Sequence, residues 1–234
     1  MIEKNEFKIF LYLSQKKYLI SVFSELDHKC LFKNEYQILV PKIEVNEIEL
    51  YDFLSQNIFN IEKKIGQFVK NINLILDIDK FLTVNLGIKN YINSQDNLDK
   101  VRLNLLYELK SDFKKNFKEF SIAHFIINNY LFDDQEHTKF DNQILCHNFC
   151  LEAKIICIKQ KDILYFENIL NRHQVAINKI LSGKYVSSFI SDKNIDECEF
   201  GMKMFNGYNL NEVFIEPKII KNKGIFEKFF KIFS

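Results

Sequence analysis

SIAHFIINNYLF, residues 121–132, and QILCHNFCLEAKIICI, residues 143–158, are the two stretches that decide the fold. Both are rich in β-branched and aromatic side chains, which favour strands, and neither contains proline. The residues between them are mostly polar, as expected of a turn. The sequence therefore predicts two long strands, Ser121–Phe132 and Gln143–Ile158, joined by a turn at Asp133–Asn142.

The patterns on either side of this hairpin alternate between strand and helix periodicity. Further strands are predicted over residues 7–13, 18–26, 29–40, 72–78, 81–91 and 174–181, and helices over residues 46–69, 98–117, 162–172, 183–190 and 200–208. Residues 191–199 read as a polar connector and residues 209–223 as a linker. Strands and helices interleaved in this way predict the α/β (α+β) class.

Composition limits the function classes. The chain of 234 residues has 32 basic and 31 acidic side chains, so it lacks the basic excess that neutralising nucleic-acid phosphates requires. The five cysteines are odd in number and form no C-x-x-C pair, which is typical of reduced thiols in a cytosolic protein. No secretory signal pattern begins the sequence. The expected partners therefore do not include nucleic acid, and no metal site is predicted.

Residues 224–234 form a short amphipathic pattern after a lysine-containing linker. At about 100° per residue, their bulky apolar side chains share one helix face and their lysines the other. The side chains predicted to bind a membrane are Lys221, Lys223, Ile225, Phe226, Lys228, Phe229, Phe230, Lys231, Ile232 and Phe233. Such a helix suits the interface of an anionic bilayer but is too short to span it. The alternatives are a helix packed on the protein's own core or in a partner's groove.

Several strings resemble the cell-division protein FtsA, the actin-like membrane anchor of the bacterial division ring. Residues 123–134 resemble the family's "HVIP...Y.VDG" strand and turn, and residues 152–156 its "LE...HII" return strand. The positions that match the motif are His124, Tyr130, Asp133 and Glu152. Weaker likenesses lie at residues 62–78, at residues 171–175 and in the C-terminal amphipathic segment.

The resemblance implies a division of the chain into parts. Residues 1–80 and 159–208 would be the remnant of one actin-like (ribonuclease H-like) subdomain. Residues 81–158 would be the strand-helix-strand-strand subdomain inserted into it, followed by the linker and a membrane-targeting helix at residues 224–234. In FtsA this inserted subdomain makes contacts between protomers and with other division proteins.

The departures from FtsA concern the nucleotide cleft. Where the family has the phosphate-binding turn "DIGT", this chain has Leu13-Ser14-Gln15-Lys16-Lys17, without glycine or aspartate. Such turns need bare backbone N–H groups close to the phosphates. The chain is also too short for both actin lobes, and the lobe that docks the ring-forming protein FtsZ would be missing. We therefore expect no cofactor and no enzymatic activity. A divergent ATPase of the actin and sugar-kinase superfamily is the alternative.

The resulting hypothesis is an FtsA-like protein on the cytoplasmic face of the bacterial inner membrane, at the division site. It would anchor division machinery peripherally, without ATP binding. Its expected partners are anionic lipids, other division proteins with FtsZ as one candidate, and further copies of itself. A soluble adaptor whose tail packs on its own core or on a partner is the second alternative.

Overall fold

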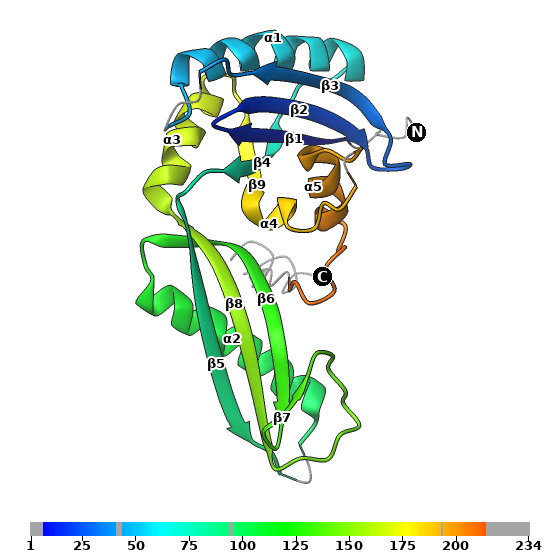
Figure 1. The fold of residues 1–234 in the computed structure, drawn as a ribbon, viewed down its shortest axis with the longest axis vertical. Helices are drawn as coiled ribbons and strands as arrows, with labels where there is room; N and C mark the ends of the chain where they lie inside the picture. The colour runs from blue at the N-terminus through cyan, green and yellow to red at the C-terminus, as the bar shows by residue number, and fades with distance from the viewer. Residues whose placement is uncertain (1–6, 41–43, 94–95, 193, 214–234) are drawn as a thin grey trace, which may run out of the picture.

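The computed structural model describes residues 7–40, 44–93, 96–192 and 194–213. Two β-sheets lie one beyond the other along the long axis of the molecule (Figure 1). The mixed α/β class predicted from the sequence is confirmed. The membrane-binding residues proposed between Lys221 and Phe233 lie outside the described residues.

The first sheet has five strands in the order β3-β2-β1-β4-β9. Its strands are β1 (Phe7–Ser14), β2 (Lys17–Ser24), β3 (Cys30–Gln37), β4 (Asn71–Asp77) and β9 (Ala176–Ser182). The first three form an antiparallel meander, whereas β4 pairs in parallel with both β1 and β9. Parallel neighbours require crossover connections, and here these connections carry the helices.

Helices cover both faces of this sheet, so its central strands are buried on both sides. On one face lie α1 (Glu47–Ile65) and α3 (Gln160–Asn171), and on the other α4 (Gly183–Ser187) and α5 (Glu197–Phe205) (Figure 1). In β1 the side chains alternate between the two cores: Leu11 and Leu13 join the α1 side, and Phe10 and Tyr12 the α5 side. This double burial explains why β1 reads as a continuous apolar run.

The second sheet has the order β5-β8-β6-β7 and a single helix, α2 (Leu98–Asn116), packed on one face. Its strands are β5 (Phe81–Tyr91), β6 (Phe120–Phe132), β7 (Gln135–His137) and β8 (Asn148–Lys159). All are antiparallel. The chain enters this unit after β4 and leaves it through β8 and α3, which lead back to β9. The second unit thus interrupts the first between two neighbouring parallel strands.

Several bounds differ from the sequence-based expectation; α1, for example, ends at Ile65 rather than near residue 69 because Gly66 adopts the left-handed conformation, with a φ of 71°. The second hairpin strand begins at Asn148 rather than Gln143, and a short strand, β7, lies inside the predicted turn. Helix α5 begins at Glu197, within the predicted polar connector, because the Asp196 side chain caps it by accepting a hydrogen bond from the Glu199 N–H at 2.8 Å.

Residues 209–213, which the sequence predicted to be linker, instead pair with β6. The Val213 N–H donates to the Phe125 carbonyl and the Ile127 N–H to the Asn211 carbonyl, both at 2.8 Å. This segment therefore extends along the edge of β6, where free backbone groups of an edge strand gain partners.

Gly183 offers a test of the packing between β4 and the start of α4. A Cβ at this position would lie 2.5 Å from the Asp77 Cβ and 2.7 Å from its Cα. We expect Gly183→Ala to lower the free energy of unfolding by roughly 1–3 kcal/mol or more, since the backbone must move to relieve the overlap. Urea unfolding measures the change.

Gly87→Ala is the matched control, because a Cβ there would meet nothing closer than 3.9 Å. Equal effects of the two substitutions on the free energy of unfolding would contradict this account of Gly183.

Candidate functional site

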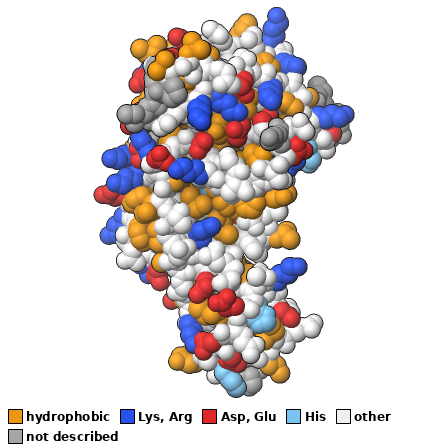
Figure 2. Space-filling view, viewed as in Figure 1, with side chains coloured by type: hydrophobic (Ala, Val, Ile, Leu, Met, Phe, Trp, Pro, Cys, Tyr) orange, Lys and Arg blue, Asp and Glu red, His pale blue; other side chains and the backbone are white. Residues whose placement is uncertain are grey.

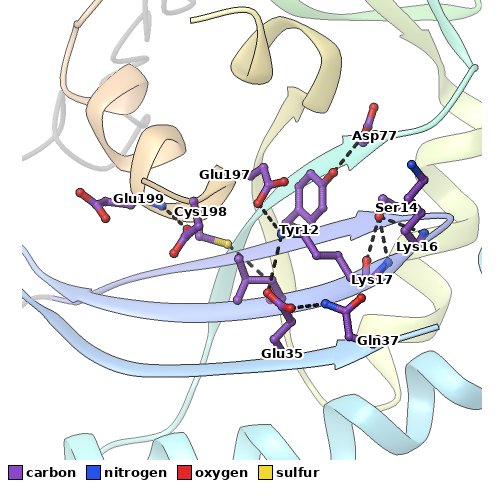
Figure 3. A network of polar contacts seen from close by, with 12 residues as sticks. Tyr12, Ser14, Lys16, Lys17, Glu35, Gln37, Asp77, Glu197, Cys198 and Glu199 are labelled. Carbon is purple, nitrogen blue, oxygen red and sulfur yellow. Dashed lines mark hydrogen bonds and ion pairs between the residues drawn. The ribbon is translucent and has the colours of Figure 1, made fainter. Parts of the chain in front are cut away.

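An actin-like ATPase would bind phosphate at the β1–β2 turn. Here the Ser14 side chain occupies two backbone N–H groups of that turn (Figure 3). The Ser14 Oγ accepts hydrogen bonds from the Lys16 N–H at 3.2 Å and the Lys17 N–H at 3.0 Å. The same hydroxyl donates to the Lys17 carbonyl at 3.1 Å. Because these two backbone donors already have an acceptor inside the turn, they are not presented to a ligand.

The surroundings of this turn are rich in carboxylates. The Tyr12 hydroxyl donates to Asp77 at 3.0 Å (Figure 3), and burial together with Asp77 and Glu197 raises the pKa of Tyr12. Lys17 forms an ion pair with Glu197 at 2.9 Å, and Lys184 forms one with Asp79. A polyphosphate here would meet acidic groups and lysines that are already paired. The described residues contain no group of three or more side chains suited to hold a metal ion.

The four FtsA-motif positions do not converge on one site. Tyr130 packs in the core between the second sheet and α2, against Phe140 and Phe149. Asp133 has a φ of 47° and accepts a hydrogen bond from the Asn148 N–H at 2.7 Å, so it closes the end of the hairpin. Glu152 accepts from the Asn129 amide at 3.2 Å. These three side chains stabilise the hairpin itself.

His124, the fourth motif position, joins the two sheets. It projects from β6, and its Nε2 accepts a hydrogen bond from the Ser182 N–H at the end of β9, at 2.8 Å. Its Nδ1 lies 2.8 Å from the Glu212 Oε1, and Glu212 also accepts from the Tyr185 hydroxyl at 3.3 Å. The side chains of His124 and Glu212 are 0% and 3% exposed. We call this set, His124, Ser182, Tyr185 and Glu212, the latch.

The hydrogen bonds of the latch determine the tautomer of His124. A backbone N–H can donate only to an unprotonated ring nitrogen, so Nε2 is bare and Nδ1 carries the proton that Glu212 accepts. Burial lowers the pKa of His124 strongly enough to outweigh the neighbouring Glu212, which favours the charged form. The neutral ring is therefore the form that the fold holds.

A groove of about 930 Å³ opens beside the latch, between the two sheets. It is lined from α2, the start of β6, β9, the end of α5 and the last two described residues. Its apolar lining consists of Phe117, Phe120, Ile122, Ala123, Phe125, Phe205 and Val213. Hydrophobic side chains also gather over the middle of the face seen in Figure 2, at the level where the sheets meet.

The charged lining of the groove is mostly basic. It comprises Lys110, Lys114, Lys118, Lys179 and Glu212. Burial lowers the pKa of Lys110 and of Lys179, and Lys114 lowers that of Lys110 further. The Glu212 carboxylate is already hydrogen-bonded to His124 and Tyr185. The groove is therefore a partly apolar surface that favours an anionic ligand.

The groove was not predicted, although the sequence holds part of the signal. Lys110 and Lys114 are four residues apart, a spacing that places them on one side of α2, and Lys118 follows in the turn after the helix. Glu212 and Lys179 could not be associated with them from local pattern alone. None of the described helices is long and apolar enough to cross a membrane.

No known family model and no curated protein matches the chain. Among solved structures it is similar to the cytoplasmic domain of EpsL, an inner membrane component of the type II secretion system of Vibrio cholerae, at 11% identity and a TM-score of 0.38, over 77% of this chain and 59% of that chain. A PilM–PilN type IV pilus biogenesis complex is similar at 8% identity and a TM-score of 0.46, over 78% of this chain and 49% of that chain.

A third similar structure is a Bacteroides thetaiotaomicron protein with an actin-like ATPase fold and unknown function. The identity is 14% and the TM-score 0.31, over 81% of this chain and 58% of that chain. The chain thus spans less than two thirds of each of these solved chains. The similarity is one of fold at low sequence identity.

The latch predicts a dependence of stability on pH. The unfolded chain takes up a proton on His124 near its ordinary pKa of 6.5, whereas the folded chain, with a lowered pKa, does not. The stabilising contribution is thus present above about pH 6.5 and is lost as the pH falls. We expect the free energy of unfolding to decrease below pH 6.5 by up to about 1.4 kcal/mol per pH unit. Urea unfolding between pH 5 and 7 measures this slope.

His124→Gln should flatten that slope, in addition to lowering stability at pH 7. His147→Gln is the control, because His147 is exposed and lies outside the latch. The interpretation fails if the two substitutions change the slope equally.

Proposed function

We propose that this protein is a non-enzymatic scaffold of actin-like construction that serves a membrane-associated bacterial division assembly, as a reduced relative of FtsA. The observation that carries the proposal is the topology. A five-stranded sheet of order β3-β2-β1-β4-β9 is interrupted between β4 and β9 by a strand-helix-strand-strand unit. This is the arrangement that the resemblance to FtsA implies.

The closed β1–β2 turn supports a role without nucleotide chemistry. An ATPase of this construction would need the turn's N–H groups for phosphate, and Ser14 occupies two of them. Nearby carboxylates, and the ion pairs that Lys17 and Lys184 already form, oppose the binding of a triphosphate. Saturable ATP binding that is lost on substitution of Ser14 and Lys17 would instead support the ATPase alternative.

The groove supports a role in partner binding. Its aromatic and aliphatic lining offers area to bury, and its lysines offer charge complementarity, which directs specificity and association rate. The partner that this chemistry fits is a protein segment that combines acidic and apolar side chains. The latch holds Glu212 of the groove lining in place, so less conformational entropy is lost there when a partner binds.

Reversal of charge in the groove tests this role. A labelled peptide of alternating glutamate, leucine and phenylalanine should bind the full-length protein, and Lys114→Glu with Lys118→Glu should weaken binding by about tenfold or more. Fluorescence anisotropy measures the dissociation constant.

The matched control is Lys100→Glu with Lys115→Glu. It makes the same change in net charge around α2, at exposed lysines that do not line the groove. Equal weakening by the two pairs would indicate a nonspecific charge effect and would contradict a groove site.

The membrane role is tested with the C-terminal segment. We expect the full-length protein to co-sediment with vesicles that contain anionic lipid, and Phe229→Glu with Phe230→Glu to release it, because charged side chains oppose burial in the bilayer interface. The variant's thermal transition should stay unchanged.

Two results would decide against this membrane role. If the full-length protein stays in the supernatant, it does not bind such membranes peripherally. If the variant loses its cooperative thermal transition, the segment belongs to the core. Localisation of a fluorescent fusion to midcell tests the division role separately.

A further inference from the structure

The edge strands of the two sheets differ in how they are protected. Unpaired edges invite association, and proteins discourage it with charged side chains, short strands and irregular register. Edge strand β3 carries Lys33 and Glu35, each in an ion pair with a neighbouring element. Edge strand β9 carries Lys179 and an irregular register against β4, and β7 has only 3 residues. These three edges are protected.

The fourth edge, β5, has little of this protection. It is 11 residues long, contains no proline and carries one charged side chain, Lys89. The charge of Lys89 does not lie at the open edge. Its Nζ is 3.0 Å from Asp134, in the β6–β7 turn, which is on the other side of β8. Figure 1 shows β5 along the outer border of the lower sheet. Within the described residues, β5 pairs only with β8.

The side chains of β5 add an apolar surface to this open edge. Val84, Leu86 and Ile88 pack against the core between the second sheet and α2 but remain partly exposed. Leu82 is 40% exposed. The alternate positions, such as Asn85 and Gly87, lie on the opposite, exposed face. A strand added beside β5 would gain main-chain hydrogen bonds and cover the half-buried apolar row.

We propose that β5 is a self-association surface, on which a second copy of this chain pairs its own β5 antiparallel about a twofold axis at Leu86. In this register Val84 faces the partner copy's Ile88, and Leu86 faces itself, so apolar side chains meet on one face. On the other face Asn85 meets Gly87, and Lys89 meets Thr83. No like charges oppose each other, which is the complementarity that a twofold contact requires.

Because β5 is complementary to itself about Leu86, the edge favours a second copy of the chain over an unrelated strand. In this dimer the second sheets of the two copies form one continuous sheet. The groove lysines lie on other elements and take no part in the pairing. The inference does not depend on the proposed function, since dimerisation and partner binding in the groove can fail separately.

A pair of charge variants tests the proposal in the full-length protein. Asn85→Lys with Gly87→Lys places lysine opposite lysine twice across the twofold axis. Asn85→Glu with Gly87→Lys places glutamate opposite lysine twice. Sedimentation equilibrium should show a concentration-dependent dimer for the wild type and for the Glu/Lys variant. The Lys/Lys variant should dissociate with a constant at least about tenfold higher.

A measurement without substitutions guards against misfolded variants. In hydrogen exchange of the wild type, the amides of β5 should become more protected as the protein concentration rises, while those of the edge strand β3 should not. A wild type that stays monomeric at about 100 μM, which is well above micromolar dissociation constants, overturns the proposal. It is equally overturned if both variants dimerise like the wild type, or if β5 protection does not depend on concentration.

Discussion

The buried hydrogen bonds of His124 are the interaction on which the arrangement of the two sheets depends. One ring joins β6 of the second sheet, the end of β9 in the first sheet and the C-terminal segment at Glu212. Removing the imidazole while the sheets stay packed would leave each of these groups buried without a partner, and an unsatisfied buried polar group costs about 1–3 kcal/mol. The latch therefore couples the position of the second sheet to that of the first, and its Glu212 lines the groove.

Hydrogen bonding and ion pairing also distinguish the β1–β2 turn from the groove. At the β1–β2 turn, Ser14 satisfies the backbone donors and carboxylates neutralise the lysines. At the groove, several lysines gather around aromatic side chains, and the single carboxylate that lines it among the described residues is held by the latch. The turn's own contacts thus occupy two backbone donors, whereas the groove lining carries more lysines than carboxylates. The groove is therefore the surface on which the proposed binding role rests.

Local pattern determined most of what could be predicted from the sequence. The long strands and helices followed from apolar periodicity. Asn46, the first residue of the helix predicted over residues 46–69, caps α1, and its side chain accepts from the Ile48 and Glu49 N–H groups. Helix α5 was predicted to start late because Asp196, Glu197 and Glu199 read as a polar connector, although acidic residues in a first turn are also a start signal. The partner of His124 lies 88 residues away, and no local pattern encodes such a contact.

The position of the groove also bears on the C-terminal segment. The described chain ends at Val213, on the groove wall, and residues 217–234 carry five lysines and one glutamate. Groove and segment therefore have the same sign of charge. Both favour anionic ligands, which is what the proposed function requires of a groove that binds an acidic partner and a segment that binds an anionic bilayer. This combination suits a protein that joins a membrane to a protein assembly better than one whose tail closes its own binding site.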